Sequence, residues 1–187
     1  MIVNRRAFLE SALPVAVAAA VGLTAPTALA QNTTGLDASS KRALAKLIDK
    51  VPAAKALSKT AVAILVFPRI TKVGLVFGAQ YGEGVLFREG KPVAYYSNTG
   101  ASWGLQAGAQ QYGYAMFFMS EAALGALTNT DGFEIGIGPS VVIVDEGMAK
   151  LTTTMNMSGD IYAFVFSQRG LMAGVGLRGN RIARISR

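Results

Sequence analysis

The sequence predicts an α+β fold: a single, mainly antiparallel β domain with curled, glycine-rich strands, an N-terminal amphipathic helix and a short middle helix. Two observations support this. Short apolar runs separated by turn residues fill the chain from Val62 onward, and a segment with helical spacing precedes them. The chain has 187 residues, of which 51 % are hydrophobic and 16 % charged, which suits one globular domain with a buried core.

Residues 1–30 have the features of an export signal. Arg5 and Arg6 precede an alanine-rich stretch that closes on an Ala-x-Ala sequence at Ala30. The order Arg-Arg-x-Phe-Leu resembles a twin-arginine signal, which exports folded bacterial proteins. A membrane anchor is the alternative, but two prolines interrupt the stretch. We expect cleavage after Ala30 and a mature periplasmic domain of residues 31–187.

The amphipathic helix is expected within Leu36–Leu57. Asp37, Ser39 or Ser40 could cap its start, and Pro52 should end or kink it. Its apolar positions recur at helical spacing, at Leu44, Leu47, Ile48 and Val51. Its other positions are rich in basic residues, namely Lys41, Arg42, Lys46, Lys50, Lys55 and Lys59.

Beyond this helix, short strands such as "VAILVF" and "VAYYS" are expected, and a turn is expected at "PRITK". Hairpin-type turns are expected at "YGEG", "REGKP", "SNTG", "TDG", "DEGM", "SGD" and "RGN". A short helix should follow Met119, with Ser120 as its N-cap. The remaining apolar runs, through "IYAFVFS", continue the strand pattern to the C-terminus.

A Gly-Leu-x-x-Gly pattern occurs three times, at Gly74–Gly82, Gly104–Gly113 and Gly170–Gly176. If each copy is one strand, Gly74, Gly78 and Gln80 share a face, and such glycines mark a bend or a close approach of two backbones. The copies do not match a phosphate-binding loop, because none gives Gly-x-Gly-x-x-Gly at the start of a helix. They favour a tightly curled sheet.

The absence of histidine and cysteine restricts the chemistry available to the chain. It excludes disulfides, a Ser-His-Asp triad and nearly every zinc site, so we expect no enzyme activity, no metal and no cofactor. The net charge of +7 indicates a polyanionic partner, either nucleic acid or an anionic membrane surface. Export disfavours nucleic acid.

Three ordered motifs carry a family resemblance: "VFPRITKVGLVFGAQYGEG", "SWGLQAGAQ", and "IYAF" followed by "GLMAGVGL". Together they resemble the SYLF domain, a lipid-binding module of bacterial envelope proteins and of eukaryotic proteins of the actin cortex, over roughly residues 40–187. The resemblance implies non-enzymatic binding of membrane lipids, particularly anionic phospholipids, with the basic N-terminal segment as a favoured contact. In eukaryotic members the lipids include phosphoinositides, which an exported bacterial protein would not meet.

On this basis the predicted lipid-binding residues are the six cations of the N-terminal segment, two near "PRITK" and two of the C-terminal tail: Lys41, Arg42, Lys46, Lys50, Lys55, Lys59, Arg69, Lys72, Arg184 and Arg187. The tail could instead be an exposed solubilising end. As a strand it would send successive arginines to opposite sides, so we expect the N-terminal segment to contribute more. If its leucines fill the core, binding should be peripheral and salt-sensitive.

Two other functions remain open. A hydrolase would have to use carboxylates, and the candidates are Asp131, Glu134, Asp145, Glu146 and Asp160. Several of these lie in turn sequences, where a capping role is commoner. A structural or homo-oligomeric envelope protein would use the uncharged region Pro92–Ser120 or the glycine-rich strand edges as its interface.

Overall fold

A computed structural model describes residues 33–74, 77–103, 108–129, 132–134, 141–145, 159–170 and 180–187. The predicted export segment, Asp131 and Glu146 lie outside these ranges. The elements are α1 (Thr33–Lys50), α2 (Pro52–Leu57), β1 (Ala63–Gly74), β2 (Phe77–Arg88), β3 (Lys91–Trp103), β4 (Gly108–Phe118), α3 (Glu121–Thr128), β5 (Phe133–Glu134), β6 (Val141–Asp145), β7 (Ile161–Gly170) and β8 (Asn180–Ile185).

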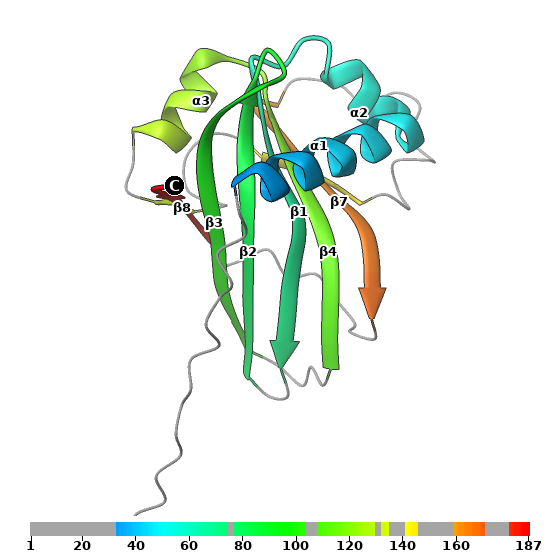
Figure 1. The fold of residues 1–187 in the computed structure, drawn as a ribbon, viewed down its shortest axis with the longest axis vertical. Helices are drawn as coiled ribbons and strands as arrows, with labels where there is room; N and C mark the ends of the chain where they lie inside the picture. Colours follow the sequence, from blue (N-terminus) through cyan, green and yellow to red (C-terminus); the bar gives the residue numbers. More distant parts are fainter. Residues whose placement is uncertain are drawn as a thin grey trace, which may run out of the picture. The chain divides into compact units, whose positions relative to one another are not determined.

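The strands form one 8-stranded sheet in the order β5-β8-β3-β2-β1-β4-β7-β6. Neighbouring strands pair antiparallel, except that β6 and β7 are parallel. The long strands β1 to β4 lie side by side in the middle of the sheet (Figure 1). The mainly antiparallel β domain with helices that the sequence predicts is confirmed.

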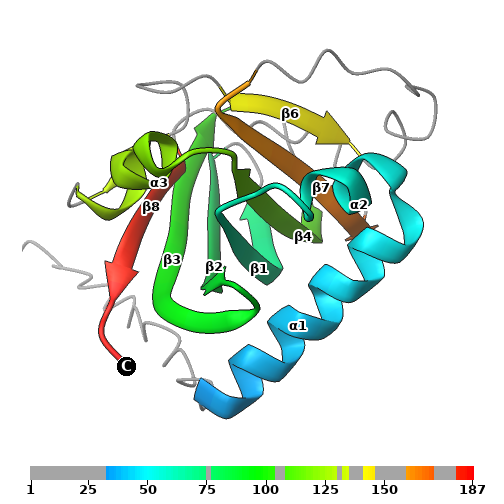
Figure 2. The same ribbon diagram turned by 90° about the horizontal axis from the view of Figure 1, so that it is seen from above.

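The sheet bends into a half-barrel, and its two faces carry different helices (Figure 2). On the face that we call convex, α1 and α2 pack through Leu36, Leu47 and Leu57 against Phe117 and Phe164. On the concave face, α3 closes a second apolar core, formed with side chains from most of the strands. The curvature therefore gives the domain two cores, one on each side of a single sheet.

The first helix ends where the sequence predicts but is not capped as predicted. α1 ends at Lys50, Val51 is extended, and Pro52 begins α2 at a position that needs no backbone N–H donor. The expected caps were wrong, because residues from Thr33 onward are already helical and place Ser39 and Ser40 inside α1. The Ser39 hydroxyl donates instead to the carbonyl of Leu36, at 2.9 Å.

Three of the predicted turns lie inside strands. "PRITK" belongs to β1, where the pairing register shifts between Val66 and Arg69, so the chain bulges at Pro68 rather than turning. "YGEG" lies in β2 and "SNTG" in β3. In β2, a Cβ atom on Gly84 would stand 2.6 Å from the ring of Phe67, so this glycine permits close packing. The "REGKP" turn is confirmed.

The first glycine repeat is not a single strand, contrary to the prediction; residues 104–107 and 171–176 of the other two copies lie outside the described ranges. The first copy is divided between β1, which ends at Gly74, and β2, which begins at Phe77. Gly74 pairs with both Gly78 and Gly108, and Gly170 lies opposite Gln110, so described glycines of all three copies meet at one end of the sheet. The strand register also places Gly74, Gly78 and Gln80 on one face, as predicted.

Candidate functional site

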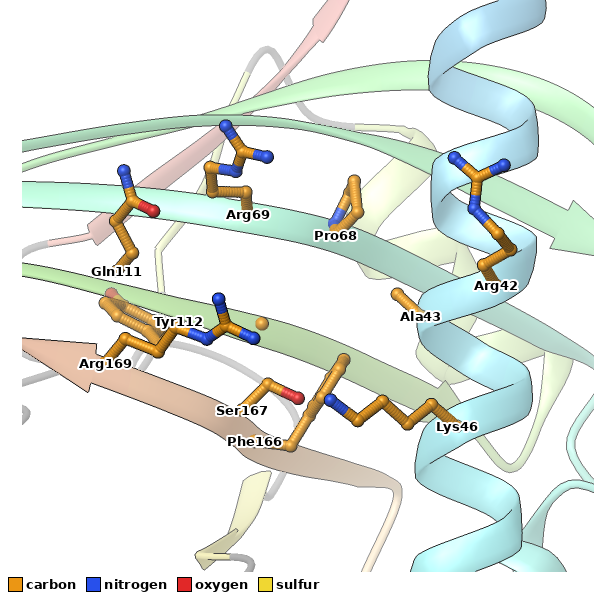
Figure 3. Close-up of a pocket in the computed structure, with 11 residues that line it drawn as sticks. Arg42, Ala43, Lys46, Pro68, Arg69, Gln111, Tyr112, Phe166, Ser167 and Arg169 are labelled. Atoms are coloured by element: carbon orange, nitrogen blue, oxygen red, sulfur yellow. The ribbon is translucent and has the colours of Figure 1, made fainter.

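A cleft of about 280 Å³ lies on the convex face between α1 and the strands β1, β4 and β7 (Figure 3). Four cationic side chains line it: Arg42 and Lys46 from α1, Arg69 from β1 and Arg169 from β7. Figure 3 shows Lys46 extending from the helix toward Phe166 and Ser167, with Arg169 beyond them on β7. Cations from three elements thus converge on one cleft.

The helix presents its two cations together because of its periodicity. Arg42 and Lys46 are four residues apart, so they lie on the same side of α1, one turn from each other. Leu47, which is 2 % exposed, packs into the convex core beside them and fixes the rotation of the helix. Core packing of this leucine therefore holds the cationic side of α1 over the strands.

Irregularities in two strands bring the other cations to the cleft. In β1 the bulge at Pro68 precedes Arg69. Where β7 pairs with β4, the register shifts between Gln111 and Gly113, and Ser167 adopts a left-handed φ of 54°. A Cβ atom on Gly113 would stand 2.5 Å from the ring of Phe166, so glycine allows this ring to form part of the cleft lining.

The cleft has an excess of positive charge. Within the described ranges, no carboxylate lies within ion-pair distance of its four cations; the ion pairs found there are Arg88–Glu121 and Arg187–Glu83. Glu83 is opposite Arg69 in the β1–β2 register, but Tyr81 donates to its carboxylate at 2.8 Å and Arg187 binds it as well. Like charges at close range repel, so an anion bound between them would be stabilised.

A second groove, of about 450 Å³, runs along another side of α1. Lys41 lines it together with the half-buried Leu44 and Ile48 and with Phe87 of β2. The predicted residues Lys50, Lys55 and Lys59 are exposed but line neither space. The six cations of the N-terminal segment therefore do not form one patch. Arg42 and Lys46 line the first cleft, which we call the basic cleft, and Lys41 lines the second groove.

Lys72 does not lie on an exposed turn, where the sequence places it. It is part of β1, its residue is 1 % exposed, and it faces the concave side. The physical reason is strand alternation: Arg69 and Lys72 are three residues apart in β1, so their side chains leave the sheet on opposite faces. Lys72 therefore cannot join Arg69 in the basic cleft.

The C-terminal arginines separate as the strand spacing predicts. Arg181 pairs opposite Thr99 and Arg184 opposite Tyr96, so these two side chains lie on opposite faces. Arg184 is exposed, whereas the Arg187 side chain is only 11 % exposed and is bound to Glu83. Neither lines the basic cleft.

Arg169 is the cleft residue that the sequence interpretation missed. It immediately precedes the third glycine motif, and it reaches the cleft only because β7 pairs with β4, some sixty residues earlier in the chain. Nothing local in the sequence distinguishes it from a solvated arginine. A prediction of the β4–β7 pairing would have been needed to find it.

Two of the carboxylate candidates for a hydrolase are far apart in the strand order. Glu134 and Asp145 belong to β5 and β6, which are the opposite edges of the sheet. The described part of the chain contains no group of three or more side chains able to hold a metal ion. None of the described helices is long and apolar enough to cross a membrane.

The half-barrel and its cationic cleft define a binding domain whose site is suited to an anion. Residues 99–186 match the family model Ysc84, described as Las17-binding protein actin regulator. This match confirms the SYLF resemblance over residues 99–186, which contain the second and third of the three motifs; the first motif precedes the matched range. The family is associated with the binding of lipids or actin regulators. None of the curated proteins matches the chain.

Proposed function

We propose that this protein is a non-enzymatic domain that binds anionic phospholipids peripherally, at a membrane surface of the bacterial envelope. The observation that carries the proposal is the basic cleft, in which Arg42, Lys46, Arg69 and Arg169 converge without a described carboxylate partner. A phosphodiester headgroup offers the negative charge and the acceptor oxygens that guanidinium and ammonium groups bind well.

The sheet surface next to the cleft supports contact with a membrane. Val73 and Tyr81 are 50 % and 43 % exposed on the convex face, where α1 does not cover the strands. The strand register places small exposed residues around them: Ala79, Ala101 and Ala109. Apolar surface beside a cluster of cations is typical of proteins that bind at the headgroup boundary.

Flotation of the purified protein with liposomes of defined charge tests the proposal. We expect the protein to float with vesicles that contain phosphatidylglycerol and to float little with purely zwitterionic vesicles. The bound fraction should decline as ionic strength rises, because salt screens the exposed cations. Each cation near an anionic surface contributes on the order of 1 kcal/mol. Equal binding to both kinds of vesicle at every salt concentration would contradict it.

The place of action is part of the same proposal. We infer that the chain is exported by the twin-arginine route and cleaved after Ala30, on the basis of the motif around Arg5 and Arg6. Replacement of both arginines by lysine should leave the protein uncleaved in the cytoplasm. Cell fractionation and N-terminal sequencing check this, and full export of the double variant would exclude the route.

A structural role through self-association is the second candidate, because the exposed apolar strip around Val73 and Tyr81 would also suit a copy of the chain. Light scattering across a wide range of protein concentration separates the two functions. A dimer that persists on dilution and does not bind anionic vesicles would favour the structural role.

A further inference from the structure

The concave face carries a buried cation without a partner. The Lys72 residue is 1 % exposed, and its Nζ atom has no hydrogen-bond partner in the structure. None of the carboxylates in the described ranges lies within ion-pair distance of it. A buried ammonium without a counter-charge is strongly unfavourable, so a group that supplies negative charge there would stabilise the fold.

The surroundings of Lys72 are polar, although they are buried. Lys72 lies directly opposite Gln80 on β2 and Gln110 on β4, and the concave face continues to Asn98 on β3 and Asn180 on β8. All four amide residues are buried, between 0 % and 7 % exposed. This polar group contrasts with the apolar core that α3 covers on the same face.

Internal hydrogen bonds satisfy only part of this group. Gln80 donates through Nε2 to Oδ1 of Asn98 at 2.8 Å, and the Tyr112 hydroxyl donates to Oε1 of Gln80 at 3.1 Å. The Nδ2 atoms of Asn98 and Asn180 have no partner, and neither does Oε1 of Gln110. Three of the four unpartnered polar atoms, counting Nζ of Lys72, are therefore donors.

Glycines lie close beside these donors. A Cβ atom on Gly100 would stand 2.4 Å from Oδ1 of Asn180 and 3.1 Å from Cγ of Gln80, so glycine lets these two amides approach the backbone. Beyond Lys72 on the same face, the paired positions are Gly74, Gly78 and Gly108, which carry no side chains. Within the described residues, these three glycines therefore add no side chain to the concave face beyond Lys72.

We propose that Lys72, Asn98 and Asn180 form a buried site for a single phosphate group. One positive charge and two amide donors match the charge and the acceptor oxygens of phosphate, and Gln110 can accept from a protonated phosphate oxygen. The phosphate can come from a free phosphate or from a lipid headgroup. The site lies on the opposite face from the basic cleft and does not depend on it.

Thermal unfolding of the full chain tests the site. We expect inorganic phosphate to raise Tm, by roughly 5–10 °C at about 100-fold excess over Kd, relative to chloride at equal ionic strength. Lys72→Met should abolish this shift, whereas Lys91→Met, which removes an exposed lysine of the β2–β3 hairpin, should retain it. The proposal is overturned if neither inorganic phosphate nor a soluble lipid with a phosphate headgroup raises Tm of the parent.

A second arm uses soluble short-chain phosphatidylglycerol to distinguish the sources. Stabilisation by the lipid but not by inorganic phosphate assigns a headgroup, provided that Lys72→Met loses the effect and Lys91→Met keeps it. If Lys72→Met keeps the full lipid effect, the lipid binds elsewhere and the buried site is wrong.

Gln110→Glu is a second variant, and it keeps Lys72. Its carboxylate, opposite Lys72, should raise Tm and cancel the phosphate response. A response that survives in Gln110→Glu and in Lys72→Met contradicts the site.

Discussion

Arg69 and Lys72 are three residues apart on β1 and have opposite environments. Arg69 is exposed on the convex face and joins three other cations around an open cleft. Lys72 is buried on the concave face among amides that satisfy one another only in part. The comparison shows that strand alternation places two basic side chains of one strand on opposite faces of a curved sheet. One joins an exposed cationic surface, and the other is a buried positive charge without a described counter-charge.

The largest expected difference between the faces is in stability. Phe164 is fully buried under α1 on the convex face, with its ring edge-to-face against Phe117 at 5.2 Å. Phe164→Ala should lower the free energy of unfolding by about 3–5 kcal/mol, because it leaves a cavity. Lys72→Met should cost less than about 1 kcal/mol, since it removes a buried charge. Urea denaturation measures both; a similar loss in both variants would mean that Lys72 is an essential part of the core.

Alkaline pH should act mainly through the concave face. Burial raises the pKa of Tyr112 to about 12, an effect that its hydrogen bond with Gln80 partly offsets. The neutral phenol is favoured in the folded state, so its stabilising contribution is complete below pH 10 and is lost as the pH rises toward 12, by up to about 3 kcal/mol. Unfolding measured at pH 9 and pH 12 should show a smaller decline in Tyr112→Phe than in the parent.

Tyr81 provides the matched comparison on the convex face. Partial burial and its interaction with Glu83 raise the pKa of Tyr81 to about 12, yet its residue is 43 % exposed. Solvent screening should therefore make its contribution to the alkaline decline much smaller than that of Tyr112. If Tyr81→Phe reduces the decline as much as Tyr112→Phe does, burial on the concave face is not its cause.

The smallest effect concerns the helix that closes the concave core. The Ser120 hydroxyl accepts a hydrogen bond from the backbone N–H of Ala123 at 3.2 Å and caps α3. Ser120→Ala should lower stability by about 1 kcal/mol. Ser39→Ala, inside α1, should change it by less than about 0.5 kcal/mol, because alanine is the better helix former there. Calorimetry of the two variants measures both changes in stability. An equal loss of stability in Ser120→Ala and Ser39→Ala would exclude a specific capping role for Ser120.

Local signals in the sequence predicted the helices well. Pro52 ends α1 because its ring is incompatible with the interior of a helix, and Ser120 caps α3 because its hydroxyl can reach the first free N–H groups. The predicted start of α1 was wrong. Asp37, Ser39 and Ser40 were interpreted as caps, but these residue types also occur inside helices, and here the helix begins before them. Such signals depend on a few neighbouring residues, which is why they are visible in the sequence.

The strands and the site depend on long-range pairing, which the sequence does not display. Glycines in "YGEG" and "SNTG" were interpreted as turns, but they permit close packing within the sheet. The glycines of "YGEG" approach the β1 backbone, and Gly100 of "SNTG" approaches the Asn180 and Gln80 side chains. The bulge at Pro68 was likewise interpreted as a turn. Arg42, Lys46 and Arg69 were predicted, whereas Arg169 was missed and Lys72 was placed on the wrong side, because both depend on strand register.

The central claim is that the cleft, rather than basic charge in general, binds anionic lipid. The direct test compares Lys46→Glu plus Arg169→Glu, which reverses charge on two sides of the cleft, with Lys55→Glu plus Lys59→Glu, an equal change of charge outside it. Circular dichroism verifies folding, and affinity for phosphatidylglycerol vesicles is measured at low salt. We predict a loss of tenfold or more, equivalent to about 1.4 kcal/mol or more, in the cleft variant and less than about threefold in the other. Equal losses in the two variants would contradict the assignment of the cleft.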